Sequence, residues 1–191
     1  VKTRKLHSSR RDAFKVVNDQ AIARVNKYGK IEFLNYNKKE KGELELKLIN
    51  EKLKIGLFKS RPNMFASELK IYEKYDGLVL EGTGLGHFPI TKIDNFTSEN
   101  KKIFEEIKKI AKKIPVVMTT QCLFGRVNMN VYSPGRELLK IGVLGSQLDM
   151  LPEVAYIKLA WLLSNYKKDA KTLIGENLRG EINSRIKDEF L

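Results

Sequence analysis

The residues with the clearest capacity for chemistry lie at the start of the chain, in the segment TRKLHSSRRDAF at residues 3–14. This segment gathers lysine, arginine, histidine, serine and aspartate within a few positions, which makes it too polar for an element of a core. By residue type alone it is a surface loop that binds an anion or is merely solvated. A lysine placed there, such as Lys5, can take part in proton transfer when its surroundings perturb it. Composition alone nevertheless favours the solvated loop.

A second candidate is the glycine-rich stretch Gly82-Thr83-Gly84-Leu85-Gly86, which is followed by His87. Glycine lets backbone N–H groups approach an anion, so the stretch invites a phosphate-loop interpretation. It lacks the Gly-Lys-Ser/Thr ending, and His87 stands where the GxGxxG pattern has its last glycine. A tight structural loop is therefore favoured, with His87 as an ordinary surface histidine.

The single cysteine, Cys122, excludes an internal disulfide and fits a reducing cytoplasm. A nucleophilic cysteine needs a base, and the chain offers only His7 and His87, neither of which the sequence places beside it. A small, buried and inert cysteine is therefore the favoured interpretation. Two histidines and one cysteine also argue against a structural zinc site, so we predict no metal site.

Apolar runs and amphipathic segments predict the elements that must position these residues. From about residue 52 we expect strands at 54–59, 77–81, 115–119 and 143–144, and helices at 64–75, 98–113, 133–140, 152–164 and 169–178. Earlier, alternating stretches at 30–34 and 43–48 predict half-buried strands, with a turn at 28–30. Strands that alternate with helices predict an α/β fold, a small parallel sheet with helices on both faces. The loops at 82–89 and 120–134 then fall at the edge where such sheets bind ligands.

Composition limits the possible classes of protein. The 191 residues are 42% hydrophobic and 31% charged, enough for one good core or two small ones, and no run approaches the ~20 apolar residues of a membrane span. The formal charge is +13, and residues 1–60 hold 16 Lys/Arg against 7 Asp/Glu. Such an excess can attract a polyanion such as tRNA, but the scattered lysines favour a solvated surface. The first residue, Val1, and the polar opening suggest a fragment or a processed chain.

The string KLHSSRRDAF closely resembles the segment that carries the catalytic lysine in the asparaginase family. In that register the family lysine is Lys5, and Asp12-Ala13-Phe14 match the pattern that follows it. The form HSSRR resembles the archaeal tRNA-dependent amidotransferase subunits within that family. Four further stretches agree with the family in the same order along the chain: EGTGLGH at 81–87, TTQCLFGRVNMNVYS at 119–133, DMLPE at 149–153 and NLRGE at 177–181.

This resemblance implies a fold and an activity. Residues 1–50 would be the end of the N-terminal (catalytic) domain plus a linker, and residues 51–191 the C-terminal α/β domain. Such amidases use a Thr hydroxyl to attack a side-chain amide, and Lys5 would assist its deprotonation. The protein would release ammonia from Gln or Asn for conversion of Glu-tRNA(Gln) to Gln-tRNA(Gln). In related asparaginases the glycine-rich loop reaches a neighbouring subunit's active site, which makes His87 a weak substrate-contact candidate.

The same resemblance implies partners: a kinase/transamidase subunit that uses ATP and Mg²⁺, the Glu-tRNA(Gln) substrate, and a second copy of the chain in a homodimer. No cofactor is expected on this chain itself, and the setting would be cytoplasmic.

One departure from the family pattern limits these expectations. The family nucleophile lies in a Thr-Gly-Gly-Thr segment and a second Thr in Gly-Thr-Asp-Thr, and neither string occurs here. Both belong upstream, so no threonine of this chain is assigned the nucleophile's role and the chain alone is expected to be inactive. A stand-alone L-asparaginase and a non-catalytic dimerisation or tRNA-docking fragment stay open as alternatives.

Overall fold

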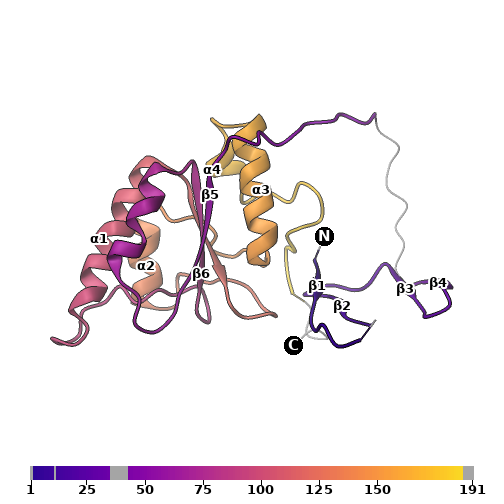
Figure 1. The fold of residues 1–191 in the computed structure, drawn as a ribbon, viewed down its shortest axis with the longest axis horizontal. Helices are drawn as coiled ribbons and strands as arrows, with labels where there is room; N and C mark the ends of the chain where they lie inside the picture. The colour runs from indigo at the N-terminus through magenta and orange to yellow at the C-terminus, as the bar shows by residue number, and fades with distance from the viewer. Residues whose placement is uncertain (1, 11, 35–42, 187–191) are drawn as a thin grey trace.

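The computed structural model describes residues 2–10, 12–34 and 43–186, and its ribbon is drawn in Figure 1. Two short antiparallel hairpins open it, β1 (Thr3–Lys5) with β2 (Phe14–Val16), and β3 (Ala23–Val25) with β4 (Ile31–Phe33). A parallel sheet follows in the order β5-β6-β7, made of β5 (Ile55–Lys59), β6 (Gly77–Gly82) and β7 (Val116–Thr120). The helical elements are η1 (Ala66–Glu68), η2 (Lys70–Lys74), α1 (Ser98–Lys113), α2 (Ser133–Lys140), α3 (Pro152–Asn165) and α4 (Ala170–Leu173).

The parallel sheet carries helices on both faces, as the sequence predicts. Because side chains alternate along a strand, Leu78, Leu80 and Met118 enter the core beneath α1 and α2, whereas Val79 and Val117 enter the core beneath α3 and α4. Figure 1 shows α1 and α2 on one side of the sheet and α3 on the other. On α1, fully buried isoleucines at 103, 107 and 110 recur at helical spacing, which confirms the predicted amphipathic helix.

Most of the elements predicted from residue 52 onward are confirmed to within two residues, but two of the predicted helices differ. The predicted helix at 64–75 is two 3₁₀ segments, because N–H groups of Leu69, Tyr72 and Tyr75 bond to carbonyls three residues back. The predicted helix at 169–178 is only the single turn α4. Gly175 follows it, and Asn177 then accepts the N–H of Gly180 at 2.9 Å, which favours a turn over a continued helix. The short strand at 143–144 is a single parallel bridge from Leu144 to Val117.

The first fifty residues differ more from expectation. The turn at 28–30 forms, with Gly29 at φ +81° and the Asn26 side chain accepting the N–H of Tyr28 at 2.9 Å. The prediction that the strand at 30–34 is half-buried is wrong, since Ile31 and Phe33 are 55% and 65% exposed.

The strand predicted at 43–48 does not form. Residues 43–50 instead run beside α3, where the carbonyls of Lys47 and Leu48 accept side-chain N–H bonds from Trp161 and Asn165 at 3.0 and 3.1 Å. No second strand lies beside this segment among the described residues, so its alternating leucines at 44, 46 and 48 stay exposed. No helix of the described ranges is long and apolar enough to cross a membrane.

Candidate functional site

Lys5, the predicted catalytic lysine, ends strand β1 on the first hairpin. It lies opposite Phe14 of β2, and just beyond it the N–H of Leu6 donates to the carbonyl of Ala13 at 2.8 Å. Both Lys5 and Phe14 are exposed. The Lys5 ammonium forms no hydrogen bond or ion pair with any residue that the structure describes, so it is free to meet another part of a site.

In the polar loop after Lys5, the described side chains contact one another. Arg10 Nε donates to Asp12 Oδ1 at 2.6 Å, His7 Nε2 lies 3.5 Å from the same oxygen, and Ser9 Oγ lies 3.3 Å from His7 Nδ1. Desolvation works to raise the pKa of Asp12, but the hydrogen bond and charge of Arg10 outweigh it, and the net effect lowers that pKa. The acid that follows Lys5 is therefore committed to the loop and not to Lys5. Arg11 lies outside the described residues.

The hairpin presents two different faces. Lys2 and Arg4 point toward the C-terminal domain: Lys2 Nζ lies 3.1 Å from Asp149 Oδ2, and Arg4 Nη2 lies 3.5 Å from Glu153 Oε1 at the start of α3. Because successive side chains on a strand point to opposite faces, Lys5 must point away from that domain.

A buried polar group, which we call the Asp149 cluster, consists of Lys2, Asn18, Asp149 and Asn183. Besides Lys2, the Asp149 carboxylate accepts the backbone N–H of Asn183 on Oδ1 and its side-chain amide on Oδ2, both at 3.0 Å. The Asn183 amide also donates to the carbonyl of Asn18 at 2.5 Å. Asn18 in turn exchanges two 2.9 Å hydrogen bonds with the backbone of Gly125, in the loop after β7.

The sequence interpretation missed this cluster. Lys2, Asn18 and Asp149 are at most 4% exposed. These three residues lie far apart in the sequence, with 147 positions between Lys2 and Asp149, so they form no local pattern. The available signal was that Asp149 opens the DMLPE stretch that resembles the family.

His87 closes a tight turn at the end of β6. The N–H of Thr83 donates to the His87 carbonyl at 3.0 Å, and Gly86 has φ +93°, a conformation that glycine tolerates. The loop after β7 reaches this turn through Thr120 Oγ1, which donates to the Gly84 carbonyl at 2.5 Å, so the two loops expected at the ligand edge do lie together. The His87 ring packs edge-on against the Tyr132 ring, with 5.2 Å between the ring centroids. The buried Nε2 of His87 has no hydrogen-bond partner among the described residues. No interaction within the described ranges joins His87 to Lys5.

The prediction that Cys122 is buried is wrong, because its side chain is exposed. Its N–H donates to Thr120 Oγ1 at 3.1 Å, and the preceding Gln121 uses its amide to bond the carbonyl of Ser60 at 2.6 Å. The side chain that enters the fold at this point is therefore Gln121, and Cys122 turns outward. Within the described ranges, no three His, Cys, Asp or Glu side chains gather as metal ligands would.

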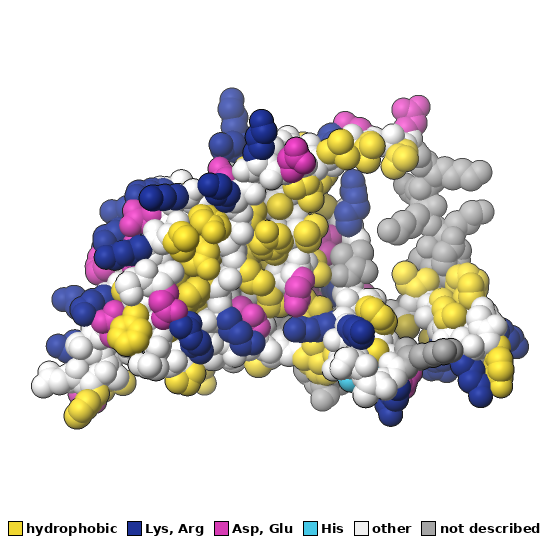
Figure 2. Space-filling model, in the orientation of Figure 1, with side chains coloured by type: hydrophobic (Ala, Val, Ile, Leu, Met, Phe, Trp, Pro, Cys, Tyr) yellow, Lys and Arg dark blue, Asp and Glu magenta, His cyan; other side chains and the backbone are white. Residues whose placement is uncertain are grey.

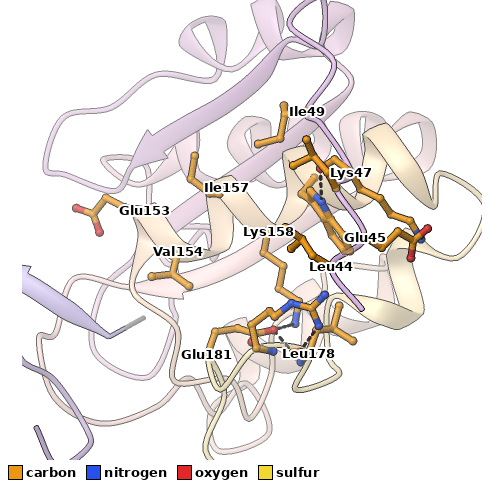
Figure 3. Close-up of a pocket in the computed structure, with 13 residues that line it drawn as sticks. Leu44, Glu45, Lys47, Ile49, Glu153, Val154, Ile157, Lys158, Leu178 and Glu181 are labelled. Carbon is orange, nitrogen blue, oxygen red and sulfur yellow. Dashed lines mark hydrogen bonds and ion pairs between the residues drawn. The ribbon is translucent and has the colours of Figure 1, made fainter. Parts of the chain in front are cut away.

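A groove of about 640 Å³ lies between residues 44–49 and α3 (Figure 3). Most of its lining is apolar, including Val154, Ile157 and Trp161. One buried ion pair, Lys158 Nζ to Glu181 Oε1 at 2.7 Å, lies at its floor. Glu181 also accepts the N–H of Arg179 at 2.6 Å, which fixes the turn at 177–181 against α3.

The electrostatics of this ion pair favour ionised Glu181. Desolvation works to raise the pKa of Glu181, but the bonds from Lys158 and from backbone N–H groups outweigh it, so the net pKa is lowered. Because these polar groups are already paired, the groove offers shape and apolar surface but no reactive group.

The excess positive charge does not form one continuous patch on the face in view. In Figure 2, Lys and Arg side chains lie interspersed with Asp and Glu over α1. Ion pairs also form between neighbouring positions of α1, such as Lys102 with Glu99 at 2.8 Å between Nζ and Oε2 and Lys109 with Glu106 at 3.2 Å between Nζ and Oε2. This mixture is typical of a solvated surface.

Comparison with known proteins identifies the fold. The sequence profile of the Glutaminase/Asparaginase C-terminal domain matches residues 54–173, well over half of the chain. The chain belongs to the glutaminase/asparaginase family. Within this family it is 43% identical over 194 residues to a glutamyl-tRNA(Gln) amidotransferase subunit of Pyrococcus furiosus, and 42% identical over 199 residues to the corresponding protein, of the same name, of Thermococcus kodakarensis.

These matches cover nearly all of the chain but less than half of the relatives. The Pyrococcus match covers 97% of this chain and 41% of that protein, and the Thermococcus match covers 100% and 42%. A solved structure of the family, the thermostable L-asparaginase from Thermococcus kodakarensis, aligns with a TM-score of 0.81 at 28% identity, over 96% of this chain and 54% of that one. These matches confirm the expected family and its C-terminal α/β fold.

Proposed function

We propose that this member of the glutaminase/asparaginase family is the C-terminal part of the amidase component of a Glu-tRNA(Gln) amidotransferase. The complete protein releases ammonia from Gln or Asn, and a partner kinase/transamidase subunit uses it to convert Glu-tRNA(Gln) to Gln-tRNA(Gln). Identities of 42–43% to proteins of that name, over almost the whole chain, support the assignment. The partner subunit uses ATP and Mg²⁺, and the setting is cytoplasmic.

The observation that carries the proposal for this chain is the placement of Lys5. It is an exposed ammonium on a hairpin face that points away from the C-terminal domain, and its own neighbours leave it unpaired within the described ranges. A lysine in that position can contact a nucleophile supplied by another part of the protein. There it assists deprotonation of a Thr hydroxyl, which is otherwise a weak nucleophile. The family resemblance makes His87 the candidate substrate contact from a second copy; in this chain its Nε2 is buried and has no hydrogen-bond partner among the described residues.

The direct test is Lys5→Ala in the full-length protein. If Lys5 assists the nucleophile, glutaminase turnover should fall by on the order of 10²-fold or more, because general acid–base groups contribute about that much. The matched control is Lys15→Ala on the neighbouring strand, an exposed lysine of the same hairpin that should leave turnover unchanged. Unchanged turnover in Lys5→Ala would refute the assignment.

A stand-alone L-asparaginase is the second candidate, and the TM-score of 0.81 to such an enzyme favours it. The two are separated by measuring ammonia release with and without Glu-tRNA(Gln) and the kinase/transamidase partner. Release that is indifferent to both would favour the asparaginase. Reading the coding region upstream of Val1 is a further check, because an amidase requires Thr-Gly-Gly-Thr and Gly-Thr-Asp-Thr there. Absence of both would leave the non-catalytic dimerisation or tRNA-docking fragment. We expect the 191-residue chain by itself to show no amidase activity.

A further inference from the structure

We propose that Asp149 is a positioning residue for Lys5. Through the Asp149 cluster it fixes the β1–β2 hairpin to the C-terminal domain and thereby sets the direction in which Lys5 points. The proposal rests on the function proposed above for Lys5, and it assigns a role in that function to residues far from the reacting atoms.

The cluster holds the hairpin at both of its open ends. Lys2 immediately precedes β1, and Asn18 lies two residues after β2. The two strand ends are also joined to each other, because the N–H of Val17 donates to the Lys2 carbonyl at 2.9 Å. The Asp149 carboxylate bonds Lys2 directly and reaches Asn18 through Asn183, and the Asp149 backbone carbonyl also accepts the Asn18 side-chain amide at 3.4 Å. The hairpin therefore enters and leaves the domain at one fixed point.

The cluster also joins the loops of the domain to this point. Asn18 pairs with the backbone of Gly125, which belongs to the loop after β7. Asn183 brings in the C-terminal segment, which runs between α3 and the hairpin in Figure 1. Arg126 donates to the carbonyl of Ser184 at 3.3 Å and secures that segment from the other side. Loop, C-terminal segment and hairpin thus share one buried polar centre.

The direction of Lys5 follows from this attachment. Lys2 and Arg4 contact Asp149 and Glu153 from one face of β1, so Lys5 occupies the opposite face. A shift of one residue along a strand moves every side chain to the other face. If the contact of Lys2 is lost, the one ion pair among the described residues that still joins β1 to α3 is Arg4–Glu153, whose side chains are 37% and 60% exposed. Exposed pairs of that kind contribute little, so the angle of the hairpin becomes variable.

The burial of the cluster explains why it fixes one arrangement. The side chains of Lys2 and Asp149 are 4% and 0% exposed, so each needs its partner in a defined geometry. Alternative hairpin positions leave a buried charge unpaired. A catalytic group that is misplaced by about 1 Å can lose about 10²-fold in rate.

The experiment measures glutaminase kcat and KM in the full-length protein for Asp149→Asn, for the double variant Lys2→Met/Asp149→Asn, and for Lys5→Ala. The double variant guards against misfolding, since it removes both buried charges together. We expect kcat per folded molecule to fall about 10-fold to 10²-fold in both Asp149 variants, with KM within about threefold of the parent, because substrate contacts are elsewhere. We expect the double variant to regain thermal stability but not kcat, which separates positioning from folding.

The matched control is Lys158→Met, which breaks Lys158–Glu181, a second buried lysine–carboxylate pair among the described residues. It should lower thermal stability and leave kcat per folded molecule unchanged. Amide hydrogen exchange supplies an independent readout. The N–H of Leu6 donates to the Ala13 carbonyl at 2.8 Å, and the N–H of Val17 donates to the Lys2 carbonyl at 2.9 Å. Exchange at both amides should accelerate in Asp149→Asn but not in Lys158→Met.

Three results overturn the proposal, and failure of the function proposed for Lys5 is distinguishable from failure of the positioning role. If Lys5→Ala retains full turnover, the function proposed for Lys5 fails and the positioning role falls with it. If Lys5→Ala loses turnover while the double variant keeps the parental kcat, Lys5 is catalytic and Asp149 does not position it. Recovery of both stability and kcat in the double variant would likewise show that the cluster serves folding alone.

Discussion

Gly145 lies where an added methyl group would meet backbone rather than a movable side chain, and we expect Gly145→Ala to destabilise the domain severely. A Cβ there would overlap the carbonyl oxygen of Met118 and lie 3.0 Å from its nitrogen, and Gly145 has φ +106°. Met118 cannot yield easily, because it lies in the central core and its N–H donates to the Leu144 carbonyl at 2.8 Å. The substitution must therefore push the 143–146 segment off the edge of β7.

The size of the effect can be built from its parts. An L-residue in the left-handed region costs about 1–2 kcal/mol. Overpacking against a rigid neighbour costs about 1–3 kcal/mol. Displacing Leu144 also weakens its two bonds to β7, each of which contributes about 0.5–1.5 kcal/mol. The sum is about 3 kcal/mol or more. In a chain of this size it corresponds to a fall in Tm of about 6–12 °C.

A nearby glycine supplies the control. Gly142 has φ +91°, follows α2 as a C-terminal glycine, and has nothing within 4 Å of an added Cβ. Gly142→Ala therefore carries the conformational cost without the clash, about 1–2 kcal/mol. Urea unfolding of both variants can be followed by the fluorescence of Trp161, the single tryptophan of the chain. If the two variants lie within about 0.5 kcal/mol of each other, the clash argument is wrong.

Three further outcomes are expected from the same structure. Because the pKa of Glu181 is lowered in the folded protein, its ionised form stabilises the fold above the unfolded pKa of about 4.3, and this stability is lost as pH falls through the lower folded pKa. The difference in unfolding free energy between the parent and Glu181→Gln should therefore narrow below about pH 4. The control is Glu176→Gln, a change at an exposed glutamate, which should show no such difference. Cys122 should react with a maleimide under native conditions, and protection until urea unfolds the domain would contradict its exposed position. Trp161→Phe removes the indole N–H bond to the Lys47 carbonyl and should speed proteolytic cleavage within residues 43–50, whereas Tyr156→Phe, a change elsewhere on the same helix, should not.

The parts of the fold that sequence predicts are those whose cause is local. Ile103, Ile107 and Ile110 recur at helical spacing and lie on the buried face of α1, because helix periodicity alone decides which side is apolar. The alternating leucines at 44, 46 and 48 carry an equally regular period, but a strand also needs a neighbour to accept its hydrogen bonds, and α3 provides side chains instead. The burial predicted for Cys122 is wrong for a related reason: residue type predicts a buried cysteine, but the turn made by Thr120 and Gln121 points its side chain outward.

The candidate site likewise contains residues that the local sequence indicates and residues that it cannot indicate. The sequence indicates Lys5 because its neighbours carry the family pattern, and within the described ranges its side chain forms no hydrogen bond or ion pair that would have to be foreseen. Lys2 and Asp149 are 147 positions apart, and no periodicity or spacing connects residues at that separation. Burial makes their pairing obligatory in the folded chain, because an isolated charge there would be costly. The stretches that resemble the family therefore have different physical roles. One carries Lys5, and another, beginning at Asp149, supplies the buried charge that holds the β1–β2 hairpin in place.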